Sequence, residues 1–325
     1  MKLHRLAASI LHVLLALLAP NAICQELSDE LDNKEFHIVG YLPDYRMSDI
    51  DLAPCRLLTD LYVFSAEVSP NGALKLNRLQ NAPWAKLQTF KTTHRIRMIL
   101  CIGGWDRSAG FGPMATSPES RQRFIESVKT TCLEKRFDGI DIDWEHPSNE
   151  AEQQAYGQLL IELVEALHPL GLQVSVTMAA WQTIPANGLK SVDAVNIMSY
   201  DHDGRHSTFE AAEADIKKVI AQGATASQIH LGVPFYGRSL TDRNKAVTWA
   251  ELAERATPGS DEYDGIYFNG PETMRAKTRM ALEKGLGGIM IWELGQDAPG
   301  KQSLLSVIHG EAHRPSASPI NSSKP

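Results

Sequence analysis

The fold of this chain is decided by the stretch Phe137-Asp-Gly-Ile-Asp-Ile-Asp-Trp-Glu-His-Pro147. Its acidic residues Asp141, Asp143 and Glu145 stand two positions apart, so in a β-strand their side chains project from one face. The apolar residues between them project from the other face. A strand with one acidic and one apolar face fits few places in a globular protein, so the flanking sequence has to decide between them.

Two other interpretations of this stretch are open. Taken alone, the alternation is more typical of the solvated face of an antiparallel strand than of a buried acidic face. A calcium loop is the second alternative, but neither Asp138 nor Asp141 is followed by the glycine and the closing glutamate at the spacing that such a loop requires. The surrounding strands favour the buried interpretation, because a sheet covered on both sides has no solvated face.

Short β-rich runs alternate with helical stretches from residue 37 onward. We expect strands at 37–42, 61–65, 97–102, 139–144, 172–179, 194–198, 229–234 and 288–292. Helices are expected after the Ser117-Pro118 pair, around 156–167, at 209–222 and at 271–284. Strands that alternate with helices pair in parallel through right-handed crossovers, which predicts an α/β fold, a closed (β/α)8 TIM barrel. An open doubly wound sheet is the alternative.

In such a barrel the acidic face points into the interior, and Glu145 lies at the carboxyl end of its strand, where barrel active sites gather. Three carboxyl groups this close together in partial burial cannot all stay ionised, so at least one retains its proton to raised pH. A carboxylic acid that is protonated near neutral pH is what general acid catalysis requires. We therefore take Glu145, the outermost of the three, as the candidate acid.

Composition narrows the classes of ligand. The chain has 325 residues, 43% of them hydrophobic, and a formal net charge of −7, which gives no electrostatic footprint for nucleic acid or an anionic membrane. The glycine-rich nucleotide-binding signatures and the HExxH zinc motif are absent from the sequence. We expect no metal and no cofactor.

The ends of the chain and its cysteines are predicted as follows. Residues 1–24 combine a basic start with an apolar run shorter than the roughly 20 residues of a spanning helix, which is typical of a cleaved signal peptide. A lipid anchor at Cys24 is the alternative, and either predicts a secreted or periplasmic protein. The catalytic barrel is expected at 36–312 and a disordered tail at 313–325. Three further cysteines, Cys55, Cys101 and Cys132, are interpreted as small buried core residues, with one disulfide as the alternative.

The run from Asp138 to Glu145 resembles the DxxDxDxE signature of glycoside hydrolase family eighteen, the chitinases and their relatives. Other landmarks of that family follow in order on the expected strands, although Cys101 stands where the family often has a small or polar residue. These landmarks are Gly40-Tyr41, Ile102-Gly-Gly-Trp105, Met198-Ser-Tyr200-Asp201, Gly232-Val-Pro-Phe-Tyr236-Gly-Arg238 and Trp292. The carboxylate signature is the specific part of the resemblance, which covers nearly the whole chain after the signal peptide.

The resemblance implies substrate-assisted retaining hydrolysis of β-1,4-linked N-acetylglucosamine polymers. Glu145 would protonate the leaving oxygen, Asp143 would hold the acetamido N–H, Asp141 would share a proton with Asp143, and Tyr200 would orient the acetamido carbonyl. Asp138, of opposite strand parity, is given a structural role. The candidates for substrate contacts are Trp292, Asp201, Met198, Tyr41, Gly104, Trp105, Tyr236 and Arg238, with Trp181 also considered.

Several alternatives share the signature. The chain could act as an endo-N-acetylglucosaminidase, on peptidoglycan-related sugars, as a non-catalytic chitin-binding lectin, or as a barrel enzyme with a conventional acid–nucleophile pair. The stretch from 239 to 287, between the seventh and eighth expected strands, is mostly filled by two helical segments. It is too short for a large α+β insertion, which predicts a shallow, open groove. Such a groove favours internal cleavage, or short and decorated substrates, over processive digestion of crystalline chitin.

Overall fold

A closed ring of eight parallel strands forms the core of the computed structural model, which describes residues 36–48 and 50–314. The strands are β1 (His37–Pro43), β2 (Asp60–Val68), β4 (Arg97–Gly103), β5 (Gly139–Asp143), β6 (Gln173–Met178), β7 (Ala194–Ile197), β8 (Ile229–Pro234) and β13 (Gly288–Trp292). Because β1 pairs in parallel with both β2 and β13, the sheet closes on itself. The predicted TIM barrel is confirmed, and the open sheet is excluded.

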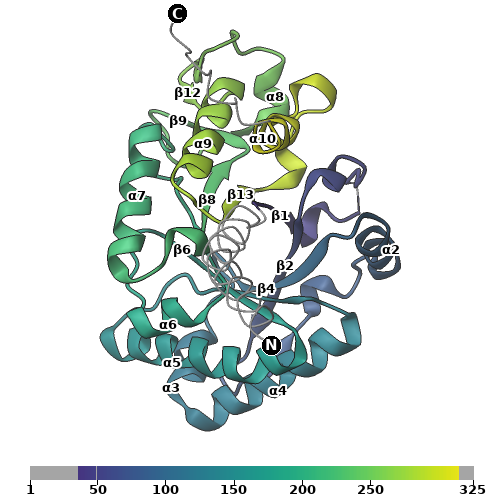
Figure 1. Ribbon diagram of the computed structural model, residues 1–325, viewed down its shortest axis with the longest axis vertical. Helices are drawn as coiled ribbons and strands as arrows, with labels where there is room; N and C mark the ends of the chain where they lie inside the picture. The colour runs from purple at the N-terminus through teal and green to yellow at the C-terminus, as the bar shows by residue number, and fades with distance from the viewer. Residues whose placement is uncertain (1–35, 49, 315–325) are drawn as a thin grey trace, which may run out of the picture. The chain divides into compact units, whose positions relative to one another are not determined.

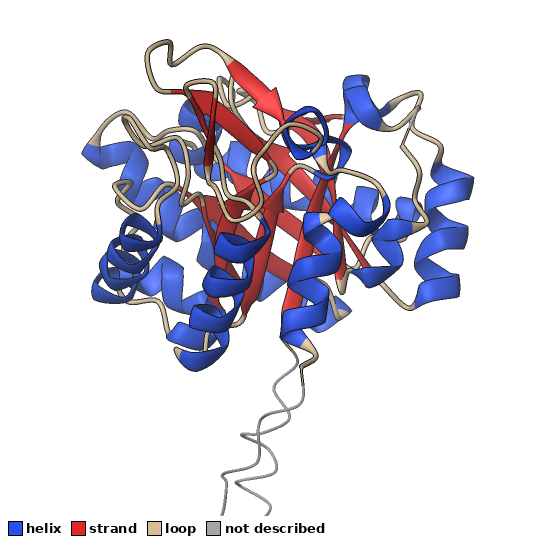
Figure 2. Cartoon of the chain, turned by 90° about the horizontal axis from the view of Figure 1, so that it is seen from above, coloured by secondary structure: helices blue, strands red, loops and turns tan. Residues whose placement is uncertain are grey.

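Helices cover the outside of this ring, as Figures 1 and 2 show. They are α2 (Trp84–His94), α3 (Phe111–Thr116), α4 (Pro118–Lys135), α5 (Glu150–Leu167), α6 (Ala186–Ser191), α7 (Phe209–Gln222), α8 (Trp249–Ala253), α9 (Pro271–Glu283) and α10 (Leu304–Ala312). Each parallel connection passes through this outer layer, so the apolar outer faces of the strands are buried against helices.

Local sequence signals set the ends of the helices. The hydroxyl of Ser117 accepts the backbone N–H of Ser120, and Pro118 occupies the first helical position of α4, where a missing N–H costs nothing. Helix α7 ends at Gly223, whose φ of 119° is open to glycine at little cost. Both boundaries agree with the helices expected from the sequence.

The interior of the barrel is divided between aromatic and polar side chains. An aromatic cluster from β1 and β2 packs Tyr41 against Tyr62 and Phe64 at ring-centroid distances of 5.1 and 6.3 Å. The facing strands β5, β6 and β7 contribute buried polar side chains, among them Asp141 and Asn196. An acidic strand can therefore lie inside the barrel because its neighbours supply hydrogen-bond donors instead of apolar packing.

The segment between β8 and β13 contains more structure than two helices. Besides α8 and α9 it forms a small antiparallel sheet in the order β10-β9-β12-β11. Its strands are β9 (Tyr236–Ser239), β10 (Ala246–Thr248), β11 (Glu262–Tyr263) and β12 (Ile266–Tyr267), and a further short strand, β3 (Leu74–Lys75), pairs with β2. Strands of two to four residues are too short to show an alternating pattern, so the sequence did not indicate them. The expected absence of a large α+β insertion is confirmed.

The cysteines and the two ends of the chain were also the subject of predictions. Cys55, Cys101 and Cys132 are buried and unpaired, as favoured from their spacing. The signal peptide and all but two residues of the expected tail lie outside the described residues. Among those that are described, no helix combines the length and the apolar character needed to cross a membrane.

Candidate active site

Asp141 lies at the centre of the barrel and is surrounded by donors. Its carboxyl is fully buried and accepts hydrogen bonds from Tyr41 Oη at 2.8 Å, Ser175 Oγ at 2.7 Å, Thr177 Oγ1 at 2.9 Å and Asn196 Nδ2 at 3.1 Å. Burial raises the pKa of Asp141, and the hydroxyl donors oppose that rise. This environment stabilises the carboxylate form as far as a buried site allows.

Asp143 lies two residues further along β5 and, unlike Asp141, is poorly supplied with hydrogen-bond donors. It is 3% exposed, and its Oδ1 is buried with no hydrogen-bond partner among the described residues. Burial, and then the negative charges of Glu145 and Asp141, raise the pKa of Asp143 well above its ordinary value. We therefore assign the proton of the inner pair to Asp143, and its bare oxygen can accept a hydrogen bond from a ligand.

Glu145 lies beyond the end of β5, with 12% of its side chain exposed. Its backbone N–H donates to Ser108 Oγ at 3.0 Å. Burial, and then the charge of Asp201, raise the pKa of Glu145 to about 7, against the opposing effect of the Trp105 backbone amide. A carboxyl with this pKa can both give and take a proton near neutral pH.

The turn after β4 holds the end of β5 in place. The backbone of Gly103 and Gly104 has φ values of 106° and 103°, which disfavour any residue with a Cβ. The N–H of Gly104 donates to the carbonyl of Asp143 at 2.7 Å, and a Cβ on Gly104 would come within 2.4 Å of the Phe64 ring. Gly104 thus supports the carboxylate strand through its backbone and its lack of a side chain.

Tyr200, Met198 and Trp292 pack on the aromatic cluster at the mouth of the barrel, and all three are partly buried. The Trp292 indole meets Phe64 edge-on at 4.8 Å, and Tyr200 meets Tyr236 edge-on at 6.3 Å. Among the residues that the structure describes, the Tyr200 hydroxyl contacts only the Met290 sulfur, a weak acceptor, at 3.9 Å. That hydroxyl is therefore available to a ligand.

Asp201 is held by two of the residues predicted to contact substrate. Tyr236 donates to it at 2.6 Å, and Arg238 forms a two-pronged ion pair with it, through Nη2 at 2.6 Å and through Nε. Burial alone would raise the pKa of Asp201, but His206, Arg238 and Tyr236 together lower it below its ordinary value. Tyr236, which is 5% exposed, acts here as a support for Asp201.

Two further predicted residues also support others. Tyr41 is 1% exposed, and its hydroxyl is committed to Asp141 and Thr177, so it belongs to the barrel interior. Asp138 accepts Lys91 Nζ and the backbone N–H of Met98, both at 2.7 Å, which agrees with the structural role expected from its strand parity.

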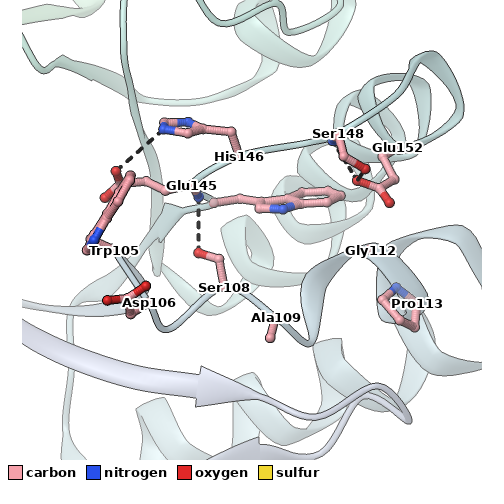
Figure 3. Close-up of a pocket in the computed structure, with 11 residues that line it drawn as sticks. Trp105, Asp106, Ser108, Ala109, Gly112, Pro113, Glu145, His146, Ser148 and Glu152 are labelled. Carbon is pink, nitrogen blue, oxygen red and sulfur yellow. Dashed lines mark hydrogen bonds and ion pairs between the residues drawn. The ribbon is translucent and has the colours of Figure 1, made fainter.

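A cavity of about 460 Å³ opens beside Glu145 (Figure 3). It is lined by residues of the turn after β4, of α3, of the segment after β5 and of the start of α5. They are Trp105, Asp106, Ser108, Ala109, Gly112, Pro113, Trp144, Glu145, His146, Ser148 and Glu152. The volume falls in the range of small-molecule sites and is far larger than that of a single water.

Exposed aromatic side chains follow three barrel strands at their carboxyl ends. Tyr45 after β1, Trp105 after β4 and Trp181 after β6 have exposed fractions of 56%, 69% and 67%. Trp105 lines the cavity beside Glu145 and Trp181 packs against His146, so two of these rings lie next to the candidate acid. Tyr45 was not singled out from the sequence, although its position just after the first expected strand would have indicated it.

Sequence reasoning also missed a pair of polar residues next to the candidate acid. His146 Nε2 lies 3.6 Å from Glu145 Oε2, and its Nδ1 lies 3.1 Å from Gln182 Oε1. Gln182 is 4% exposed and donates through Nε2 to the carbonyl of Trp144 at 3.1 Å. The adjacency of His146 to Glu145 was visible in the sequence, but the contact with Gln182 depends on the fold.

Together the fold and the site define a barrel protein whose strand β5 carries two buried carboxyl groups, with a third, Glu145, beside a cavity. A model of the glycosyl hydrolases family 18 matches residues 37–297, so the chain belongs to that family. This confirms the resemblance drawn from the carboxylate signature.

Individual relatives agree with this assignment. The chain is similar to Endochitinase 1 of Metarhizium robertsii, with 27% identity over 279 residues, which are 67% of this chain and 65% of that relative. It therefore spans less than two thirds of that fungal protein. Chitotriosidase-1 of Mus musculus is 24% identical over 320 residues, covering 73% of this chain and 68% of the mouse protein.

Solved structures show the same fold. The GH18 chitinase ChiB of Flavobacterium johnsoniae superimposes with a TM-score of 0.77 and 28% identity over 86% of this chain and 94% of that structure. A chitinase-like agglutinin of Robinia pseudoacacia has a TM-score of 0.71 at 23% identity, over 84% of this chain and 99% of that structure, which shows the shared fold alone.

Proposed function

We propose that this chain hydrolyses β-1,4-linked N-acetylglucosamine polymers, chitin or its oligosaccharides, with Glu145 as the acid that protonates the leaving oxygen. The observation that carries this proposal is the carboxyl of Glu145, which is poised with a pKa of about 7 at the edge of a cavity of small-molecule size. The names of the relatives, an endochitinase and a chitotriosidase, support the choice of substrate.

The environment of Asp143 favours substrate-assisted catalysis over a conventional acid–nucleophile pair. A carboxyl that burial and two neighbouring charges keep protonated is a poor nucleophile. Its bare Oδ1 suits the role of accepting the N–H of the 2-acetamido group. The acetamido oxygen of the sugar then attacks the anomeric carbon as Glu145 donates its proton, and water activated by Glu145 opens the resulting ring.

The other residues at the mouth have supporting roles in this proposal. The free hydroxyl of Tyr200 would donate to the acetamido carbonyl and fix its direction of attack. Trp292 and Met198 would form the apolar floor under the reacting sugar. Asp201, ionised by its two clamping residues, would supply the negative charge that keeps the proton on Glu145.

The exposed aromatic rings support an extended substrate. Sugar C–H faces stack on aromatic rings, and Tyr45, Trp105 and Trp181 offer three such faces around one mouth. Since the segment between β8 and β13 is small, we propose an open groove that accepts the interior of a chain, so that cleavage is internal.

The test is release of chromophore from aryl glycosides of chitobiose and chitotriose. We expect turnover by the native chain and its inhibition by a compound that mimics the oxazolinium intermediate. Retained binding of chito-oligosaccharides without any turnover would support a lectin, and turnover that the oxazoline mimic does not inhibit would support a conventional nucleophile. Preferential release of N-glycans or of peptidoglycan fragments would redirect the substrate assignment.

We further propose that residues 1–24 are a cleaved signal peptide, that 36–312 form the catalytic barrel, and that 313–325 are a disordered tail. The composition of the first 24 residues supports export to the cell exterior or periplasm. Mass spectrometry of the mature protein tests this proposal. An N-terminus at Gln25 is expected, and a retained residue 1 or a lipid on Cys24 would contradict it.

A further inference from the structure

The environment of His146 is fixed by the amide of Gln182. The carbonyl oxygen of Trp144 can only accept a hydrogen bond, so the group of Gln182 that faces it at 3.1 Å is the NH2. The carbonyl oxygen of Gln182 must then face His146 Nδ1, and it too can only accept. Nδ1 therefore carries the hydrogen, and in the neutral ring Nε2 is the unprotonated nitrogen.

That unprotonated nitrogen points at the candidate acid (Figure 3). The separation between His146 Nε2 and Glu145 Oε2 is 3.6 Å, with the two side chains 20% and 12% exposed. The lone pair on Nε2 repels a carboxylate at this distance, whereas a protonated carboxyl can close the gap by donating its hydrogen. The ring is kept in place by the indole of Trp181, whose centroid lies 4.5 Å away.

Among the described residues, three carboxyls, one phenol and the Trp105 backbone amide also face Glu145. Asp143 faces it from β5, Asp106 from the turn after β4, and Tyr200 and Asp201 from the segment after β7. Burial, and then the negative charges of Asp201 and Asp106, raise the pKa of Glu145 to about 7. Burial also lowers the pKa of His146, with the Gln182 hydrogen bond opposing it, which favours the neutral ring.

We propose that His146 is a positioning residue for the acid: Gln182 holds its Nε2 unprotonated, and that nitrogen keeps the proton on Glu145 until the leaving oxygen takes it. This inference rests on the proposed function for its catalytic meaning, but the arrangement of the three side chains can be tested separately. If Glu145 is positioned in this way, the pH above which activity is lost depends on His146 and Gln182 as well as on the carboxyl groups around Glu145.

The test compares His146→Phe with the native chain. Phenylalanine keeps the ring and the burial but removes the lone pair of Nε2. If burial alone sets the pKa of Glu145, this pKa should stay the same or rise. If the lone pair holds the proton on Glu145, the pKa should fall. We expect the alkaline limb of kcat/KM on a chitobiose aryl glycoside to move to lower pH by about half a unit or more. Gln182→Met should move it in the same direction, because the ring can then present a protonated Nε2 to Glu145.

A second readout does not depend on turnover. Carbon-13 NMR of glutamate-labelled protein, with the Glu145 signal identified by its loss in Glu145→Gln, reports the titration of this carboxyl directly. His168→Phe is the control, since this half-exposed ring pairs with Asp193 outside the site and should leave both readouts unchanged.

The outcomes separate the two proposals. A downward shift of the Glu145 titration in both His146→Phe and Gln182→Met supports the positioning role. An unmoved or upward shift in His146→Phe overturns it. If the native chain releases no chromophore, the proposed function fails, and the NMR titration alone then decides the positioning role.

Discussion

Replacing Tyr41 with phenylalanine removes one hydroxyl from the centre of the barrel and leaves its ring in place. That hydroxyl donates to the Asp141 carboxyl at 2.8 Å and contacts Thr177 Oγ1 at 2.6 Å. The aromatic packing with Tyr62 and Trp292 involves only the ring and should survive. The perturbation is therefore confined to the hydrogen bonding of a buried carboxyl.

The size of the effect follows from the partners of Asp141. A hydrogen bond to a charged group contributes about 1.5–3 kcal/mol, and three other donors remain on this carboxyl, so we expect a loss of about 2 kcal/mol in the free energy of unfolding. For a domain of this size, that loss lowers Tm by roughly 3–4 °C. The hydroxyl donors lower the pKa of Asp141, so losing one raises this pKa further. The cost should be largest where Asp141 is ionised and shrink as pH falls through its folded pKa.

Thermal and urea unfolding at several pH values measure this prediction. Tyr62→Phe is the matched control, because its hydroxyl lies in the same cluster but contacts the neutral Ser175 Oγ at 3.1 Å. A neutral hydrogen bond contributes about 1 kcal/mol, and its loss should depend little on pH. Equal losses in the two variants, or a Tyr41→Phe cost that grows on acidification, would refute an ionised Asp141 held by donors.

Three further predictions concern the groove and the acid. Trp105→Ala should raise KM for chitotriose aryl glycosides about three- to tenfold with little change in stability. Leu133→Ala, at an exposed position on α4, should change neither KM nor stability. A KM of Trp105→Ala equal to that of the native chain would show that Trp105 does not contact the substrate. Because Glu145 must be protonated to act, kcat/KM of the native chain should fall as pH rises through about 7, and a flat profile between pH 6 and about 8 would contradict that assignment. Arg238→Met leaves the charge of Asp201 uncompensated, so the alkaline limb should move to higher pH, opposite to the shift expected for His146→Phe; a downward shift would count against the role of Asp201.

Much of the barrel could be predicted because its strands are long enough to show a pattern. The eight expected strands correspond to the observed ones, and the two-residue spacing of Asp141, Asp143 and Glu145 fixed their common face. The donors around Asp141 were not predicted, because they depend on how neighbouring strands align. Asp141 is opposite Ser175 and Thr177 is opposite Asn196 in the register of β5, β6 and β7. Register between strands cannot be deduced from any one of them.

The residues missed at the mouth have a different physical reason. Gln182 reaches His146 from a turn 36 positions further along the chain, and the conformation of such turns is not visible in a pattern of apolar and polar residues. Tyr41 and Tyr236 also have partners that the sequence did not indicate. Each follows the pattern of a substrate contact, but its hydroxyl is committed to a carboxyl, Asp141 in one case and Asp201 in the other.

The central claim is tested most directly by the kinetics of Glu145→Gln on a chitotriose aryl glycoside, together with the affinity of that variant for chito-oligosaccharides. The amide keeps the shape of the side chain but has no transferable proton, so we expect kcat to fall about 10²–10⁴-fold. Affinity measured by calorimetry should remain within about threefold of the native value, since the change removes a transition-state interaction alone. Near-native kcat in this variant would contradict the account, because the proton would then come from another group.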